Sequence, residues 1–162
     1  MSTVARRAGH AGGLLFVAGL LAVVSGEPFV FPSLGPSAYL LAVRSDGSAR
    51  RVVGGHAVGV AAGAVAYGSL AAGVAVTDAF QPFDPAVVRL AAASVVAVAA
   101  TTAGMLLTET RHAPACATTL IVSLGLLSAP RDLVVILLSV GVLYATHLVG
   151  VWVGRRSWSA FS

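Results

Sequence analysis

Charged residues divide this 162-residue chain into six uncharged stretches, each at least 16 residues long. They are residues 8–26, 28–43, 52–77, 90–108, 112–130 and 133–154. A helix that crosses a bilayer needs about 20 mostly apolar residues, with a range of roughly 17 to 25. Five stretches meet this length and residues 28–43 are borderline. Because only 10% of the residues are charged, we predict an all-α polytopic membrane protein rather than a soluble globule.

Six spans with short links use nearly the whole chain. We therefore expect a single transmembrane domain over residues 1–162, with any binding site lying among the helices. Arg6 and Arg7 precede the first stretch, as in a signal peptide, but Glu27 and Pro28 lead directly into further apolar sequence. We interpret this stretch as a retained first span in contact with the lipid bilayer.

The positions of the arginines predict how the spans are oriented. If residues 28–43 and 112–130 both cross, one side collects eight of the ten arginines, and the other keeps only Arg89 and Arg131. If both re-enter without crossing, five arginines lie opposite the four near the termini. Positive residues favour the cytoplasmic side, so we expect a multi-pass protein of the cell membrane with both termini cytoplasmic. The basic residues form no stripe interleaved with aromatics, which argues against nucleic acid as a partner.

The six predicted spans divide into two halves of similar pattern, about 12–76 and 86–153. Each half has a long helix, a short segment containing proline, a link bearing arginine and a second long helix. Three spans per half is an odd number, so the second half starts on the opposite face, which predicts two inverted three-helix repeats. Any six-helix protein divides into threes, which is the simpler alternative. Short proline-interrupted segments at matching places favour a transporter site.

Small residues recur at helical spacing in the third stretch. Gly55, Gly59 and Gly63 follow one another every fourth residue. In lipid, faces of small residues let helix backbones approach closely, so we expect these glycines to pack against another helix. Glycine and alanine are common throughout this chain, so the alternative is that this spacing reflects composition alone. The sequence also leaves a homo-oligomer open.

Prolines in the second stretch predict a broken helix. Pro32, Gly35 and Pro36 make a continuous helix unfavourable, whereas Pro36 suits the first turn of a new helix at about 36–43. Such an N-terminus near the membrane interior favours an anion, with Ser33 and Ser37 as additional donors. The alternative is a simple proline kink.

The fifth stretch begins with positively charged or protonatable residues beside a second proline. Arg111 and His112 precede Pro114, which again suits a first helical turn. Two such N-termini that faced each other would suit a small anion. Arg111 could instead lie among lipid headgroups. His56 and His147 lie within predicted spans and are functional candidates, although a neutral histidine bonded to a backbone carbonyl is equally ordinary.

No chemistry other than binding is indicated. None of the six stretches contains Asp or Glu, which argues against a carboxylate relay and against a site for metal cations. The single Cys116 allows neither a disulfide nor a zinc-binding cysteine pair. No phosphate-binding loop, zinc motif or set of nucleophile, base and acid is present. We therefore expect no enzyme activity, no metal and no cofactor.

Three segments in this order resemble the HPP family of small integral membrane proteins. Residues 33–41, SLGPSAYLL, are similar to that family's S-x-G-A-S-A-x-L-L segment. Residues 51–56, RVVGGH, resemble R-N-x-x-G-G-H, and residues 112–118, HAPACAT, resemble the H-P-P-x-G-A-T stretch that names the family. The spacing agrees from about residue 14 to 150. Ala113, Cys116 and Pro36 depart from the usual Pro, Gly and Ala.

The resemblance implies an all-helical membrane protein, and some plastid and cyanobacterial members are associated with nitrite transport. The positions that match its motifs become site candidates: Ser33, Gly35, Ser37, Gly55, His56, His112, Pro114 and Thr118. Our leading hypothesis is a transporter of a small inorganic anion such as nitrite, with Arg111 beside the site. A membrane scaffold or sensor that acts through helix contacts is the main alternative. A channel is the third.

Overall fold

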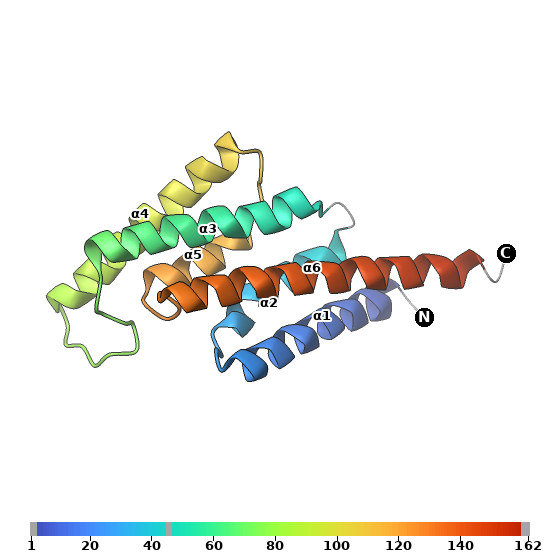
Figure 1. Ribbon diagram of the computed structural model, residues 1–162, viewed down its shortest axis with the longest axis horizontal. Helices are drawn as coiled ribbons and strands as arrows, with labels where there is room; N and C mark the ends of the chain where they lie inside the picture. Colours follow the sequence, from blue (N-terminus) through green and yellow to red (C-terminus); the bar gives the residue numbers. More distant parts are fainter. Residues whose placement is uncertain (1–2, 45–46, 160–162) are drawn as a thin grey trace.

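The computed structural model describes residues 3–44 and 47–159, with side chains as far as Gly154, and this part of the chain is all-helical. Its six helices are α1 (Thr3–Ser25), α2 (Val30–Val43), α3 (Ala49–Leu70), α4 (Pro85–Leu107), α5 (Ala115–Ser123) and α6 (Pro130–Ser159) (Figure 1). The expectation of an all-α fold is confirmed for these residues, and each uncharged stretch contains one helix, but the six membrane spans expected from the sequence are confirmed only in part.

Four helices, α1, α3, α4 and α6, are long and apolar enough to cross a membrane. The other two are shorter: α2 has 14 residues and α5 has nine. At about 1.5 Å per residue these two helices measure roughly 21 and 14 Å, less than the ~30 Å hydrocarbon core. The second and fifth uncharged stretches therefore contain the two short helices.

The half-helix predicted at 36–43 is not present, because α2 runs without interruption from Val30 to Val43 with Pro36 inside it. Pro32 lies in the first turn, where backbone N–H groups have no intrahelical acceptor, so it costs no helical hydrogen bond. Pro36 removes one bond only, the one that would reach the carbonyl of Pro32. One missing bond inside a packed helix kinks it at most.

α5 is also shorter than the predicted segment 113–129, since it ends at Ser123. Gly125 has a φ of 77°, which a residue with a side chain rarely adopts. The N–H groups of Gly125 and Leu126 donate to the carbonyls of Val122 and Ile121 at 3.1 Å. This is a glycine-terminated helix end, and residues 124–129 form the link to α6.

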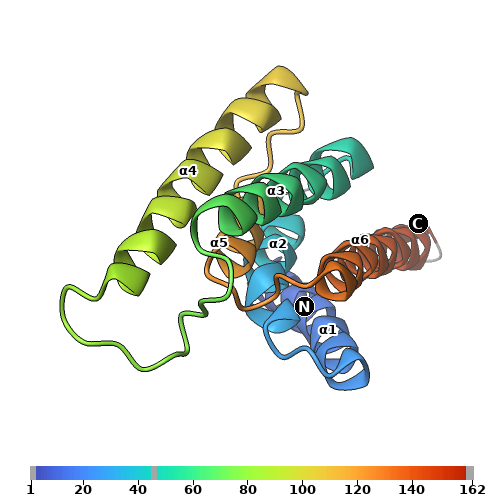
Figure 2. The ribbon, with the colours of Figure 1, turned by 60° about the vertical axis from the view of Figure 1, so that its left-hand side comes forward.

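The two short helices lie at the centre of the bundle, with the four long helices around them (Figure 2). α2 packs against α1, α5 and α6, whereas α5 packs against α2, α3 and α4. Successive helices run in opposite directions, so the start of α1, the end of α6 and the α2–α3 and α4–α5 links lie at the same end of the molecule (Figure 1). We call this the arginine-rich end.

The contacts between helices have an internal symmetry. If α1 is exchanged with α4, α2 with α5 and α3 with α6, every strongly packed pair of helices becomes another such pair or remains the same pair. The exchange also relates two arginines. Arg50 at the start of α3 donates to the carbonyl of Thr108 beyond α4, at 2.9 Å. Arg131 at the start of α6 donates to the carbonyl of Ser25 at the end of α1, at 3.0 Å.

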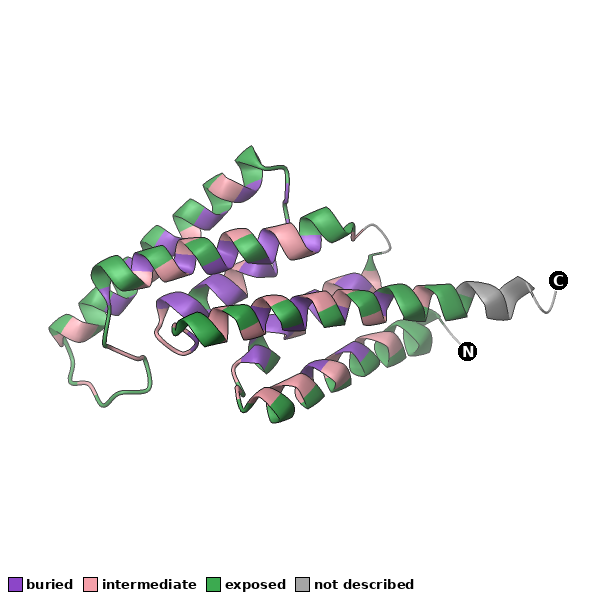
Figure 3. Ribbon diagram, viewed as in Figure 1, coloured by how far each residue is buried: buried purple, intermediate pink, exposed green. Residues whose placement is uncertain are grey.

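Burial follows the same division into centre and periphery (Figure 3). Six of the nine residues of α5 are buried, and the long helices bury only one stripe each. Many large apolar side chains on the outer faces are exposed, among them Phe16, Val23, Val95, Leu107 and Leu138. An apolar surface of this extent suits lipid rather than water.

Candidate functional site

Five of the predicted site residues come together at the centre of the bundle and form what we call the buried polar cluster. Ser33 and Ser37 come from α2, His56 from α3, Thr118 from α5, and His112 from the link before α5. The first four are fully buried and His112 is 4% exposed. The sequence motifs that suggested these residues are far apart in the chain, and the helix packing joins them.

The cluster is a continuous hydrogen-bonded chain. Ser37 Oγ lies 2.8 Å from His56 Nε2 and 2.9 Å from His112 Nε2. Thr118 Oγ1 lies 2.7 Å from His56 Nδ1 and 2.7 Å from Ser33 Oγ. The chain therefore runs from Ser33 through Thr118, His56 and Ser37 to His112.

The unbroken course of α2 is what places both serines in this chain. Residues four apart lie on the same face of an α-helix, so Ser33 and Ser37 point toward the same neighbours. A break at Pro36 would have removed this relation.

Close approach of α3 to α5 completes the cluster, and glycines make it geometrically allowed. A Cβ atom at Gly55 would lie 2.8 Å from His112 Cβ, and one at Gly59 would lie 2.7 Å from Thr119 Oγ1. At Gly63 the nearest atom would be Val122 Cβ, at 2.9 Å. All three distances are shorter than a real side chain tolerates. The glycine stripe of α3 thus lies against α5 and the link that precedes it.

The protons of the cluster can be arranged in two opposite orders. Ser37 has one hydroxyl proton, so it can donate to only one of the two histidine Nε2 atoms, and the other must donate to it. If Ser37 donates to His56, the Nδ1–H of His56 donates to Thr118 and His112 donates to Ser37. If Ser37 donates to His112, each of these bonds reverses. Both orders keep the two histidines neutral, and a shift between them moves a proton along the chain.

The remaining predicted residues lie outside this chain. Gly35 is half-buried and its nearest side-chain neighbour is Leu15 of α1. Pro114 is buried immediately before α5. Arg111 is exposed at the arginine-rich end, and His147 lies on α6 beside His10 of α1.

The backbone N–H groups expected to bind an anion are already paired. In the first turn of α5, the N–H groups of residues 115–117 donate to the carbonyls of residues 112–114 at 2.9 to 3.1 Å. In α2, the helix start expected at residue 36 lies inside a continuous helix, so the N–H groups that follow Pro36 belong to the helix interior. The expected anion site at two broken-helix N-termini is therefore not formed.

A small pocket adjoins the cluster at the arginine-rich end. Its volume is about 60 Å³. It is lined by Leu40, Leu41, Arg44, Gly47, Arg51, Arg111 and His112. We call it the arginine pocket. A wider open pocket of about 420 Å³ shares Arg51 and Arg111 with it and also includes Glu109. Arg51 and Arg111 thus border both pockets, and His112 lines the smaller one.

Beyond His112 the interior is packed. Neither of these two pockets is lined by Ser33, Ser37 or Thr118. Among the described residues, every buried side-chain nitrogen and oxygen has a hydrogen-bond partner. The cluster is closed in this conformation.

Burial also controls the charge of His112, which lies in the link outside the spanning helices. Removal from water disfavours the charged imidazolium and lowers the pKa of His112 from 6.5 to about 4. At neutral pH this histidine is uncharged, so the positive charge of the arginine pocket comes from its three arginines.

Some polar residues of the interior were not predicted from the sequence. Thr101 of α4 and Thr119 of α5 are fully buried, with their hydroxyl oxygens 2.9 Å apart. Nothing distinguishes them in the sequence from the other serines and threonines. Arg44 and Arg51 also escaped notice as pocket residues. The available signal was their place in the sequence, because Arg51 begins the second family motif and Arg44 lies three residues after the first.

The comparison with known families agrees with the architecture. The transmembrane region of the HPP family matches residues 2–158, nearly the whole chain. No curated protein and no solved structure gives a significant match. The matched region includes all six helices and the buried polar cluster. The chain therefore belongs to the HPP family of integral membrane proteins.

Proposed function

We propose that this protein transports a small inorganic anion, with nitrite as the first candidate, and that the anion binds in the arginine pocket beside His112. The observation that carries the proposal is a small cavity with three arginines at the end of a buried chain of polar groups. Polar chains inside a membrane protein are costly and usually functional.

The composition of the pocket selects for charge and size. Arg44, Arg51 and Arg111 bring three positive charges, and none of its seven lining residues is acidic. Guanidinium groups bind planar oxyanions through charge-assisted hydrogen bonds. A volume of about 60 Å³ is roughly twice the ~30 Å³ share of one water molecule. An anion of a few atoms fits such a space, and a larger metabolite does not.

His112 links anion binding to a proton. A negative charge in the arginine pocket favours the imidazolium and therefore raises the pKa of His112 from its low value in the empty protein. Anion affinity should then increase as the pH falls toward that value. A proton taken up at His112 can pass to Ser37 and His56 along the buried chain. When His112 is protonated, the anion and the proton would move together.

Alternating access offers a way to open the closed interior. The symmetric pairing of helices and the equivalent bonds of Arg50 and Arg131 support two inverted repeats. In transporters built this way, one repeat rocks against the other around a central site. The buried polar cluster lies at the contact between α2 and α5, which are the corresponding members of the two halves.

Purified protein in liposomes tests the proposal through the flux of nitrite, nitrate, formate and chloride. Arg111→Gln should reduce nitrite flux strongly, because it removes a pocket charge. Arg89→Gln, which makes the same change at the opposite end, should leave flux unchanged. His112→Gln keeps a hydrogen-bond donor for Ser37 but cannot take up a proton. It should therefore retain flux at neutral pH and lose the increase at low pH.

A second function is favoured by a separate observation, the packed and fully hydrogen-bonded centre. A scaffold or sensor that acts through its helical faces needs no internal cavity. Flux equal to that of empty liposomes for all four anions would contradict transport and favour the scaffold. Saturable flux would identify a carrier, whereas a current proportional to voltage would identify a channel.

A further inference from the structure

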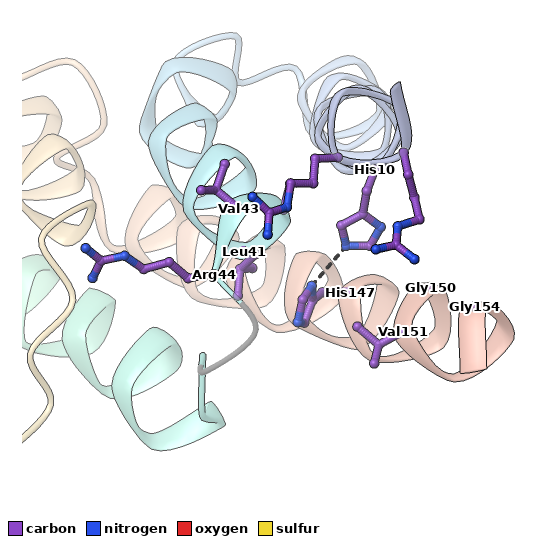
Figure 4. A pocket seen from close by; sticks show the side chains of 11 residues that line it. His10, Leu41, Val43, Arg44, His147, Gly150, Val151 and Gly154 are labelled. Atoms are coloured by element: carbon purple, nitrogen blue, oxygen red, sulfur yellow. Dashed lines mark hydrogen bonds between the residues drawn. The ribbon is translucent and has the colours of Figure 1, made fainter. Parts of the chain in front are cut away.

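A second and larger cavity lies at the arginine-rich end, between the start of α1, the end of α2 and the last turns of α6 (Figure 4). Its volume is about 610 Å³, ten times that of the arginine pocket. It is lined by Arg6, Arg7, His10, Leu41, Ala42, Val43, Arg44, His147, Gly150, Val151 and Gly154. We call it the α1–α6 pocket.

Among the described residues that line this pocket, every charged side chain is positive. Arg6 and Arg7 are exposed on the first turns of α1, and Arg44 follows the last residue of α2. No acidic residue is among the eleven that line it. Within residues 3–44 and 47–154, no carboxylate is within ion-pairing distance of these three guanidinium groups. Three arginines in one cavity without an acid strongly favour an anionic ligand.

A histidine pair forms one wall. His10 Nε2 lies 3.0 Å from His147 Nδ1, a contact that spans the α1–α6 interface (Figure 4). One of these two nitrogens must be protonated and the other must accept, so His10 Nδ1 and His147 Nε2 remain as further polar positions. A Cβ atom at Gly150 would lie 2.7 Å from His10 Cε1. α6 therefore has a notch that His10 occupies.

Apolar side chains also line the pocket. Leu41 and Val43 of α2 and Val151 of α6 line the same cavity as the arginines. Both α1 and α6 are candidate membrane spans, so the pocket lies where spanning helices end. A basic group beside an apolar wall at this level matches a phosphate that is joined to a glycerol and acyl chains.

We infer that the α1–α6 pocket binds a phosphate-bearing anion, with Arg6 and Arg7 contacting the phosphate and the His10–His147 pair beside it. Two sources share this chemistry, an acidic phospholipid headgroup and a soluble phosphate ester. The apolar wall favours the lipid. This inference does not depend on anion transport, because Arg6, Arg7 and both histidines lie outside the arginine pocket.

Native mass spectrometry of the full chain in detergent measures binding of dioleoylphosphatidylglycerol, with dioleoylphosphatidylcholine as the neutral comparison. Phosphatidylglycerol should bind more tightly. The double variant Arg6→Gln with Arg7→Gln should weaken its binding roughly 10- to 30-fold, because each arginine at a membrane surface contributes a severalfold factor. Arg89→Gln removes a positive charge at the opposite end of the molecule, so this variant should bind phosphatidylglycerol as the wild type does.

A pair of glycine variants separates the pocket from general attraction to a negative surface. Gly150→Leu keeps every arginine but displaces His10 and fills the pocket, so phosphatidylglycerol binding should fall. The control variant is Gly141→Leu. Gly141 lies on the same helix, and no other residue has an atom within 4 Å of the position that its Cβ would take, so this variant should leave binding unchanged. Circular dichroism and the elution volume verify that each variant is folded.

Inorganic phosphate and glycerol 3-phosphate identify the source of the ligand. If either displaces phosphatidylglycerol, the phosphate site is supported, and a soluble phosphate or phosphate ester is its ligand. If neither does and the lipid still binds, the phospholipid is the ligand. Equal binding of the two lipids without binding of either soluble phosphate would overturn the inference. Binding that Gly150→Leu leaves intact would do the same.

Discussion

Ser37 is the residue on which the buried polar cluster depends most. Its single hydroxyl contacts the Nε2 atoms of both His56 and His112, so it joins α2 to α3 and to the link before α5. Ser33, at the other end of the chain, contacts Thr118 alone within the cluster. Thr118 keeps His56 as a second partner. Two serines of the same helix therefore differ in how many buried groups rely on them.

Removing the hydroxyl of Ser37 should destabilise the protein more than removing that of Ser33. Ser37→Ala leaves two buried imidazole nitrogens without this partner, and we expect a loss of about 2 kcal/mol in the free energy of unfolding. Ser33→Ala leaves Thr118 bonded to His56 and should cost about 1 kcal/mol or less. Unfolding in mixed micelles titrated with dodecyl sulfate measures both. A larger loss for Ser33→Ala would contradict the arrangement of the chain.

At the scale of elements, the contact between α3 and α5 determines whether the cluster can form. α5 is too short to cross a bilayer and too short to be a stable helix alone. It is held by its neighbours, and the glycine face of α3 lets it approach until backbone atoms are nearly in contact. At Gly59 an added Cβ would lie 2.9 Å from the carbonyl oxygen of Ala115, and at Gly63 it would lie 3.0 Å from that of Thr119.

Gly59→Ala should separate these two helices. The new methyl group meets both a side chain and the backbone of α5, neither of which can move without shifting the helix, so we expect a loss of roughly 1 to 3 kcal/mol in stability. The matched control is Gly68→Ala, on the same helix but exposed and without any neighbour within 4 Å. Alanine there should stabilise the helix by about 0.5 kcal/mol or more. Thermal unfolding in detergent compares the two, and equal shifts would argue against the close contact.

At the scale of the whole molecule, the two halves are held by similar bonds at opposite ends. Arg50 bonds the carbonyl of Thr108, and Arg131 bonds that of Ser25. Each bond satisfies a carbonyl at or beyond the end of a long helix, where no intrahelical donor remains. If the halves are inverted repeats, the two arginines have equivalent roles.

Arg50→Gln and Arg131→Gln should therefore lower thermal stability by similar amounts, each about 1 kcal/mol. Arg131 also lies 3.8 Å from Glu27, but its side chain is 72% exposed, and such surface pairs contribute little. Lysine at either position keeps the charge without the planar donor geometry and should recover part of the loss. A loss at one site and none at the other would indicate that the halves are not equivalent.

The orientation of the molecule follows from its arginine-rich end. Six of the arginines, at positions 6, 7, 44, 50, 51 and 111, line the three pockets gathered there. Positive residues favour the cytoplasm, so this end should face inward. In a Cys116→Ser background, Ala49→Cys should be protected from an impermeant maleimide in intact cells, whereas Thr77→Cys at the opposite end should react. The reverse pattern would contradict this orientation.

Particular residues show how far sequence reasoning extends to the site. Ser33, Ser37, His56, His112 and Thr118 were all identified from motifs, and they form one cluster. The helix start predicted beside Ser37 was wrong, because Ser37 lies inside an unbroken helix, where it contacts two histidines. The effect of a proline on a helix is local. The packing of α2 against its neighbours outweighed the loss of the one hydrogen bond that Pro36 removes.

The sequence by itself determined that this protein is a helical membrane protein, because the spacing of the charged residues determines which apolar segments are long enough to lie within a bilayer. It also determined which end gathers the arginines. Only the tertiary structure decided that α2 continues through Pro36, that α5 ends at Ser123, and that the candidate residues form a hydrogen-bonded chain beside an arginine pocket. These features depend on contacts between helices far apart in the chain. No local pattern of residues encodes the distance from Ser37 to His56 and His112.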